Sequence, residues 1–117
     1  MSNPIDRYDV GPRMSEMAVY NGVAYLAGQV AEDGSQGIEG QTAQVLAAID
    51  KLLARAGSDK SRILRAQIFL VDLADFAAMN GVWEKWVAAG HTPPRATVQA
   101  ALARPEWKIE IVVTAAV

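Results

Sequence analysis

The stretch ILRAQIFLVDLADFAAMNGVWEKWVAAGHTPPRATVQAAL, residues 63–102, predicts a strand, a helix and a second strand in succession. Residues 63–72 are too few and too rich in β-branched and aromatic side chains for a helix, so we expect a buried strand there. In residues 73–89 large apolar side chains recur at helical spacing, with Asp72 as the expected N-cap and Gly90 at the end. This order permits a parallel crossover, for which right-handed connections are the rule.

The segments on either side of this stretch add a hairpin, a helix and a final strand. Residues 17–30 hold two apolar runs separated by Asn21-Gly22, a dipeptide typical of a type I′ turn. Residues 41–56 carry apolar side chains at helical spacing and are followed by a glycine suited to a helix C-terminus. With a last strand over residues 107–116, the order becomes ββ-α-β-α-ββ. We therefore expect an α+β domain with a mixed sheet and two helices on one face.

Length and composition limit the class of protein. The chain has 117 residues, of which 51% are hydrophobic and 21% charged, which is typical of one globular domain over residues 1–117. The net charge of −2, without a basic stripe, disfavours nucleic-acid binding. The absence of cysteine excludes disulfides and a thiol nucleophile, and a single histidine excludes a histidine-rich metal site. No segment is typical of a signal peptide or a membrane span, so we expect a cytoplasmic protein.

The last two strands carry opposite charges, Arg95 and Glu110, within apolar patterns. Alternate residues of a strand share a face, and we expect the purely apolar faces to lie beneath the helices. If these two strands pair through their short connection, Arg95 and Glu110 lie together on the face away from the helices. Phe69 and Val71 then lie on this face too, which makes it more apolar than a solvated sheet face. We therefore expect another subunit to cover it.

Two interpretations of Arg95 and Glu110 are open from the residues themselves. Charges on strands commonly form a structural ion pair or reach water at a strand end. Alternatively, Pro93 and Pro94 fix the backbone before Arg95, whose planar guanidinium binds a carboxylate through two hydrogen bonds. A neighbouring glutamate can then orient water or move a proton. Such a pair suits a small organic acid as the ligand.

Three blocks that together span nearly the whole chain resemble the RidA/YjgF family of enamine/imine deaminases. They are GVAYLAGQV (22–30), AAIDKLLARAGSDKSRILRAQIFLVDLADFAAMNGVWEKW (47–86) and PPRATVQAALARPEWKIEI (93–111). The Pro-Arg pair followed by Lys-Ile-Glu-Ile is the specific part of the resemblance. The segments RMSEMAVYNG (13–22) and AGHTPPRATVQA (89–100) resemble the YoaB-like branch of the family.

This resemblance implies a chorismate-mutase-like fold of the bacillus type, in a homotrimer whose sheets form a barrel. It implies three sites in clefts between subunits, with no metal and no other cofactor. Arg95 matches the arginine that binds the substrate carboxylate, and Glu110 matches the glutamate that positions the attacking water. Asn80 and the backbone of Gly28 match further residues of the pocket. The implied reaction is hydrolysis of small 2-enamine or 2-imine carboxylic acids, similar to 2-aminoacrylate, to 2-oxo acids and ammonia.

Three positions depart from the archetype of the family. Arg13 replaces a tyrosine, Ala27 a serine and Thr97 a cysteine. Arg13 and Ser15 are candidates for additional polar contacts with the substrate, and Thr97 is a candidate for holding the water together with Glu110. These changes leave the identity of the substrate open.

Two other functions are open beside deamination. One is a non-catalytic trimeric module that binds small carboxylates, as a sensor or as a partner of another protein. The other is hydrolysis of a related aminoacrylate or carbamate metabolite. Ribonuclease activity, which has been attributed to relatives, is disfavoured here by the charge balance and by the lack of a catalytic histidine pair.

Overall fold

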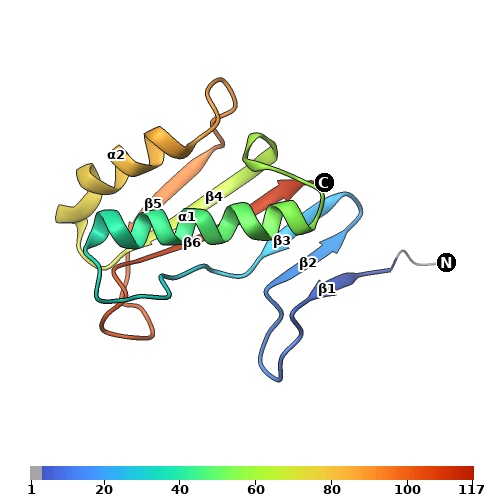
Figure 1. Cartoon of the computed structure of the whole chain (residues 1–117), viewed down its shortest axis with the longest axis horizontal. Helices are drawn as coiled ribbons and strands as arrows, with labels where there is room; N and C mark the ends of the chain where they lie inside the picture. Colours follow the sequence, from blue (N-terminus) through green and yellow to red (C-terminus); the bar gives the residue numbers. More distant parts are fainter. Residues whose placement is uncertain (1–3) are drawn as a thin grey trace.

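The computed structural model describes residues 4–117, which form a six-stranded sheet covered on one face by two helices (Figure 1). In chain order the elements are β1 (Asp6–Tyr8), β2 (Met17–Tyr20), β3 (Val23–Leu26), α1 (Ile38–Arg55), η1 (Lys60–Arg62), β4 (Ile63–Leu70), η2 (Leu73–Asp75), α2 (Phe76–Trp86), β5 (Arg95–Gln99) and β6 (Ile109–Ala116). The strand order is β1-β2-β3-β6-β4-β5, and each neighbouring pair is antiparallel except β4 and β5, which are parallel. The predicted mixed sheet with two helices on one face is confirmed.

The predicted hairpin and crossover are both present. Asn21 has φ 50° and Gly22 has φ 78°, so both lie in the left-handed region that a type I′ turn requires. This turn pairs β2 with β3 from Met17↔Leu26 to Tyr20↔Val23. Helix α2 connects the parallel strands β4 and β5, as expected from the strand–helix–strand order.

The sequence does not predict β1, because its residues DRY lack an apolar alternation. This short strand pairs with β2, and Asp9, just after it, accepts hydrogen bonds of 2.6 and 3.2 Å from Arg55 of α1. The hydrogen bond from Arg55 lowers the pKa of the Asp9 carboxyl. The Arg55 Cζ atom also lies 5.2 Å from the ring centroid of Tyr8. These contacts hold the β1 edge of the sheet against α1.

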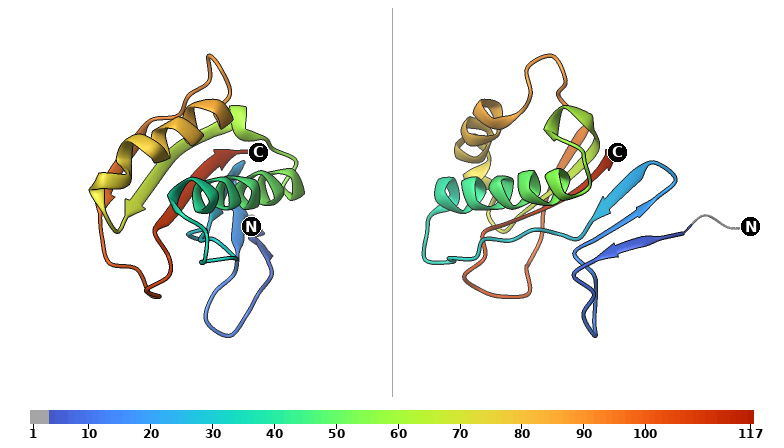
Figure 2. Two further views of the ribbon diagram at one scale, coloured as in Figure 1. Left: turned by 60° about the vertical axis from the view of Figure 1, so that its left-hand side comes forward. Right: turned by 45° about the vertical axis from the view of Figure 1, so that its right-hand side comes forward.

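The core lies between the sheet and the helices. Several helix-facing side chains of β4 and β6 are at most 1% exposed, among them Ala66, Ile68, Leu70, Ile109, Ile111 and Val113. Side chains of α1 that are equally buried pack in the same core, and they are Val45, Leu46, Ile49 and Leu53. Burying each large side chain contributes about 1.5–3 kcal/mol before the entropy cost is subtracted. Figure 2 shows α1 and α2 on the same side of the sheet, and we call the other side the open face.

The expectation that the last two strands pair, with Arg95 and Glu110 on one face, is wrong. Strand β4 lies between β5 and β6. Arg95 is paired with the buried Ala66, so the side chains of Arg95 and Thr97 lie on the helix-facing side, while Glu110 is paired with Phe69 on the open face. Alternation shows which residues of a strand share a face, but not which face that is.

Gln41 of α1, which is fully buried, ties together the loop before α1 and the loop between β5 and β6. Its Nε2 atom lies 3.2, 2.9 and 2.9 Å from the carbonyl oxygens of Gly34, Gln36 and Glu106. Its Oε1 atom accepts a hydrogen bond of 2.9 Å from the Lys108 backbone N–H. One amide therefore fixes both the loop after β3 and the loop that enters β6.

We expect Gln41→Met to lower the free energy of unfolding by about 2–4 kcal/mol, because buried backbone groups lose their partner at about 1–3 kcal/mol each. Urea denaturation measures this loss. The matched control is Gln44→Met, since Gln44 also makes two hydrogen bonds, of 2.9 and 3.2 Å, to the backbone of Asp33. Those bonds are accessible to water, so the control should lose less than about 1 kcal/mol. Equal losses in the two variants would contradict the proposed role of Gln41 in holding the loops.

Candidate functional site

Arg95 is held at the start of β5 with its hydrogen-bond donors unused. The backbone before it is fixed because the Ala66 N–H donates to the Pro94 carbonyl at 3.0 Å. The Arg95 Cζ atom lies 5.2 Å from the ring centroid of Trp83 and 5.9 Å from that of Phe76, both on α2. Within residues 4–117 the guanidinium makes no hydrogen bond or ion pair, since both ion pairs found there involve other arginines. Its five N–H donors are therefore available to an external anion.

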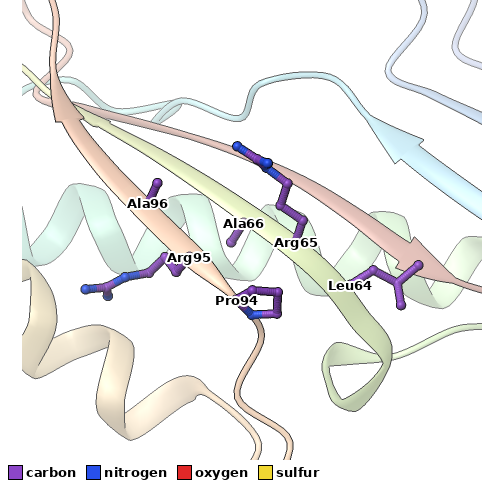
Figure 3. A pocket seen from close by; sticks show the side chains of 6 residues that line it. All are labelled: Leu64, Arg65, Ala66, Pro94, Arg95 and Ala96. Atoms are coloured by element: carbon purple, nitrogen blue, oxygen red, sulfur yellow. The ribbon is translucent and has the colours of Figure 1, made fainter.

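A cavity of about 390 Å³ lies beside the start of β5, and its lining includes Arg65, Pro94 and Arg95. Figure 3 shows the Arg95 side chain extending toward α2, whereas the Arg65 side chain of β4 extends away from α2. The volume is within the range of pockets that hold small molecules. The flank of Arg95 is thus open to a ligand of small size.

Thr97 and Asn80 lie on the helix-facing side with Arg95, outside the lining of the cavity. The Thr97 Oγ1 atom is buried and has no hydrogen-bond partner within residues 4–117, although buried hydroxyl groups are normally paired. Asn80 of α2 is half-buried. It follows Phe76 by four residues and precedes Trp83 by three, so the three side chains share one face of the helix. We call Arg95, Thr97 and Asn80 the arginine half-site.

Glu110 lies on the open face, against Gly28. Gln29 and Ile111 exchange two backbone hydrogen bonds of 2.8 and 3.1 Å, which brings the chain at Gly28 alongside β6. A Cβ atom at position 28 would lie 2.2 Å from the Glu110 Oε2 atom, so glycine is what permits this close approach. The Glu110 carboxylate makes no hydrogen bond or ion pair with any residue of 4–117. We call Glu110 and Gly28 the glutamate half-site.

Ser15 lies near the glutamate half-site, whereas Arg13 does not lie near Arg95. The Ala27 N–H donates to the Glu16 carbonyl at 2.8 Å, so the chain at Ser15 and Glu16 runs beside Ala27 and Gly28. Arg13 is exposed in the connection between β1 and β2. Strands β1 and β5 are opposite edges of the sheet, so one chain does not bring Arg13 to the arginine half-site.

One chain does not join the two half-sites. They lie on opposite faces of the sheet and are separated by β4, which places β5 and β6 about 10 Å apart. Thr97 therefore does not hold a water together with Glu110 of its own chain. The expectation that these two residues of one chain share a water is wrong. Sequence reasoning did not identify Phe76 and Trp83 as neighbours of Arg95, because a helical stripe gives no signal for contact with a residue on the next strand.

Residues 4–117 were also searched for metal sites and membrane-spanning helices. No group of three or more His, Asp or Glu side chains in residues 4–117 lies close enough to hold a metal ion. Neither α1 nor α2 of this part is long and apolar enough to cross a membrane.

Comparison with known proteins finds a matching family model and similar curated proteins. A family model described as Endoribonuclease L-PSP matches residues 6–117. The RutC family protein YoaB of Escherichia coli is 49% identical over 113 residues, covering 97% of this chain and 98% of that protein. The chain belongs to the RidA/YjgF family. The predicted resemblance, including its YoaB-like character, is confirmed.

Structural similarity to the RidA/YjgF family is equally close. The crystal structure of a YjgF family member from Neisseria meningitidis has a TM-score of 0.94 and 52% identity, covering 97% of this chain and 94% of that one. A more distant relative has an activity in its name. The chloroplastic Reactive Intermediate Deaminase A of Arabidopsis thaliana is 33% identical over 104 residues, covering 89% of this chain and 55% of that protein.

We expect Gly28→Ala to displace the Glu110 carboxylate while leaving the fold intact. The added Cβ atom meets only the flexible end of the Glu110 side chain, so the temperature of unfolding should change little. Crystal structures and thermal unfolding of the variant measure both effects. Gly81→Ala is the control, because a Cβ atom there meets nothing within 4 Å, and replacing a helical glycine should stabilise by about 0.5–1 kcal/mol. An unmoved Glu110 in Gly28→Ala would contradict the expectation.

Proposed function

We propose that the chain is a hydrolytic deaminase of small 2-enamine and 2-imine carboxylic acids. The observation that carries this proposal is a pair of charges without a charged partner within residues 4–117. Arg95 lies over two aromatic rings, and Glu110 lies against Gly28. Membership of the RidA/YjgF family supports it, as does similarity to a relative named as a deaminase of reactive intermediates.

In the proposed mechanism Arg95 binds the substrate carboxylate through two parallel hydrogen bonds. The cavity beside it accommodates a molecule with few carbon atoms. Thr97 and Asn80 supply further polar groups on the same flank, and the unpartnered Thr97 hydroxyl is free to bond with substrate or water. Fixing a short-lived imine in one orientation raises its effective concentration near the attacking water.

Glu110 orients that water for attack on the imine carbon and accepts one of its protons. The water oxygen forms the new bond to carbon, and the proton on Glu110 passes to the substrate nitrogen, which gives a carbinolamine. The hydroxyl proton of the carbinolamine then passes through Glu110 to the same nitrogen, the carbon–nitrogen bond breaks, and the products are a 2-oxo acid and ammonia. A 2-enamine first gains a proton at its β-carbon and loses one from nitrogen, which converts it to the 2-imine. Water is the sole co-reactant of this step.

We further propose that each active site combines the arginine half-site of one subunit with the glutamate half-site of the next, in a homotrimer with a chorismate-mutase-like barrel. The open face supports this, because its large apolar side chains lack a covering layer. Tyr25 is 52% exposed, Val98 44% and Tyr20 36%. Glu110 lies at the end of a row with Phe69 and Val98 across this face, so an apolar contact there would also desolvate the carboxylate.

We expect Tyr25→Asp to convert the trimer into smaller species, because it places a charge within the proposed interface. Size-exclusion chromatography with light scattering measures the mass. Ala43→Asp is the matched control, since Ala43 is exposed on α1 at the opposite side of the molecule and should leave the mass unchanged. A monomeric wild-type chain at micromolar concentration, or a trimeric Tyr25→Asp, would contradict the proposed interface.

We expect Arg95→Ala and Glu110→Gln each to lower turnover by at least about 100-fold, and a mixture of the two to regain activity. A mixed trimer has one interface that combines an intact Arg95 with an intact Glu110. Random mixing of equal amounts therefore restores roughly a quarter of the sites. The assay follows ammonia and 2-oxo acid release from imines generated in situ by an amino acid oxidase, after the two variants are dissociated and reassembled together.

The control for this experiment is Arg104→Ala. Arg104 also lies over a tryptophan ring, with its Cζ atom 5.3 Å from the centroid of Trp107, but outside both half-sites. It should turn over like the wild type. Retained turnover in Arg95→Ala would contradict the deaminase assignment, and an inactive mixture would contradict only the site shared between subunits. Carboxylate binding without turnover in the wild type would favour the non-catalytic binding module instead.

A further inference from the structure

Two aromatic rings hold the Arg95 guanidinium. Trp83 is 6% exposed and belongs to the core, whereas Phe76 is 42% exposed at the start of α2. The Arg95 Cζ atom lies over both rings, at 5.2 Å from the Trp83 centroid and 5.9 Å from the Phe76 centroid. No acidic side chain of residues 4–117 forms an ion pair with this arginine. Its direction is therefore set by aromatic contacts and not by a carboxylate of its own chain.

This arrangement suits an arginine that must bind an anion. A free arginine side chain has many rotamers, and fixing it costs entropy that weakens ligand binding. An acidic partner would fix it, but would also occupy its N–H donors. An aromatic ring attracts the cation through the ring face and accepts none of the strong hydrogen bonds that a carboxylate would take. The donors thus stay available while the side chain is ordered.

Trp83 is itself held by the core beneath α2 and by a second tryptophan of this helix. Its ring lies 5.5 Å from the ring of Trp86, with an interplanar angle of 48°. Trp86 donates a hydrogen bond of 2.9 Å from Nε1 to Asp50 Oδ2 on α1. The ring beneath Arg95 is therefore fixed by packing of α2 against both the sheet and α1.

We propose that Trp83, assisted by Phe76, is a positioning residue that orients the Arg95 guanidinium for the substrate carboxylate. This inference rests on the proposed function, in which Arg95 binds that carboxylate. Neither ring touches the reacting atoms. Their effect is on the affinity for carboxylates and not on the chemical step.

The test compares pyruvate binding by calorimetry with the KM and kcat for imine hydrolysis. Trp83→Leu should raise the Kd of pyruvate and the KM about tenfold, with kcat changed less than about threefold. Trp83→Phe keeps an aromatic face and should show about a threefold rise. Phe76→Leu should also show about a threefold rise, and it leaves no cavity in the core because Phe76 is exposed. It keeps the test decisive if Trp83→Leu does not fold.

Trp107→Leu is the matched control. It also removes a tryptophan beneath a cation, because the Arg104 Cζ atom lies 5.3 Å from the Trp107 ring centroid, but this pair is outside the half-sites. A loss due to instability alone would lower kcat through the fraction of folded enzyme and leave KM unchanged. The Trp107→Leu variant should therefore bind pyruvate within about twofold of the wild type.

Arg95→Ala distinguishes the two levels of the proposal. Wild-type pyruvate binding in Arg95→Ala would overturn the proposed function, and the positioning role with it. Lost binding in Arg95→Ala, together with wild-type affinity in Trp83→Leu and Phe76→Leu, would overturn the positioning role alone. Equal weakening in Trp83→Leu and Trp107→Leu would likewise overturn it.

Discussion

Backbone hydrogen bonds on both sides of β4 determine where the two functional charges point. Strand β4 is parallel to β5 on one side and antiparallel to β6 on the other. The parallel pairing sets Arg95 opposite the buried Ala66 and so directs it toward α2. The antiparallel pairing sets Glu110 opposite Phe69 and directs it to the other face. A shift of one residue in either pairing would reverse the face of that charge.

The two faces of the sheet provide different environments for these charges. On the helix-facing side, α2 gives Arg95 a fixed aromatic surface and leaves its donors free. On the open face, Glu110 lies beside a glycine that makes room for it and among apolar side chains that a single chain leaves in water. Gln41 supports Glu110 indirectly, because it fixes the loop that enters β6 just before this residue.

Most of the elements were predictable, because apolar periodicity and turn residues are local signals. The helix stripe of α1 and the Asn21-Gly22 turn are examples. The order of the strands was not, since a short connection after Gln99 is compatible with direct pairing of β5 and β6. The placement of β4 between β5 and β6 depends on tertiary packing, which the local pattern of apolar residues does not determine. Arg95 and Glu110 were noticeable in the sequence as charges within apolar strand patterns, whereas Gly28 and the other site residues came from family motifs.

The placement of Arg95 and Glu110 on opposite faces has a consequence for regulation by concentration. If each active site needs contributions from two subunits, the isolated chain is a folded but inactive form. Dilution below the assembly constant would then remove activity without unfolding any domain, and ligands that bridge two subunits would favour assembly by mass action. The catalytic activity of such a protein depends on its own concentration. A higher concentration raises both the number of chains and the fraction of them that are assembled into complete active sites.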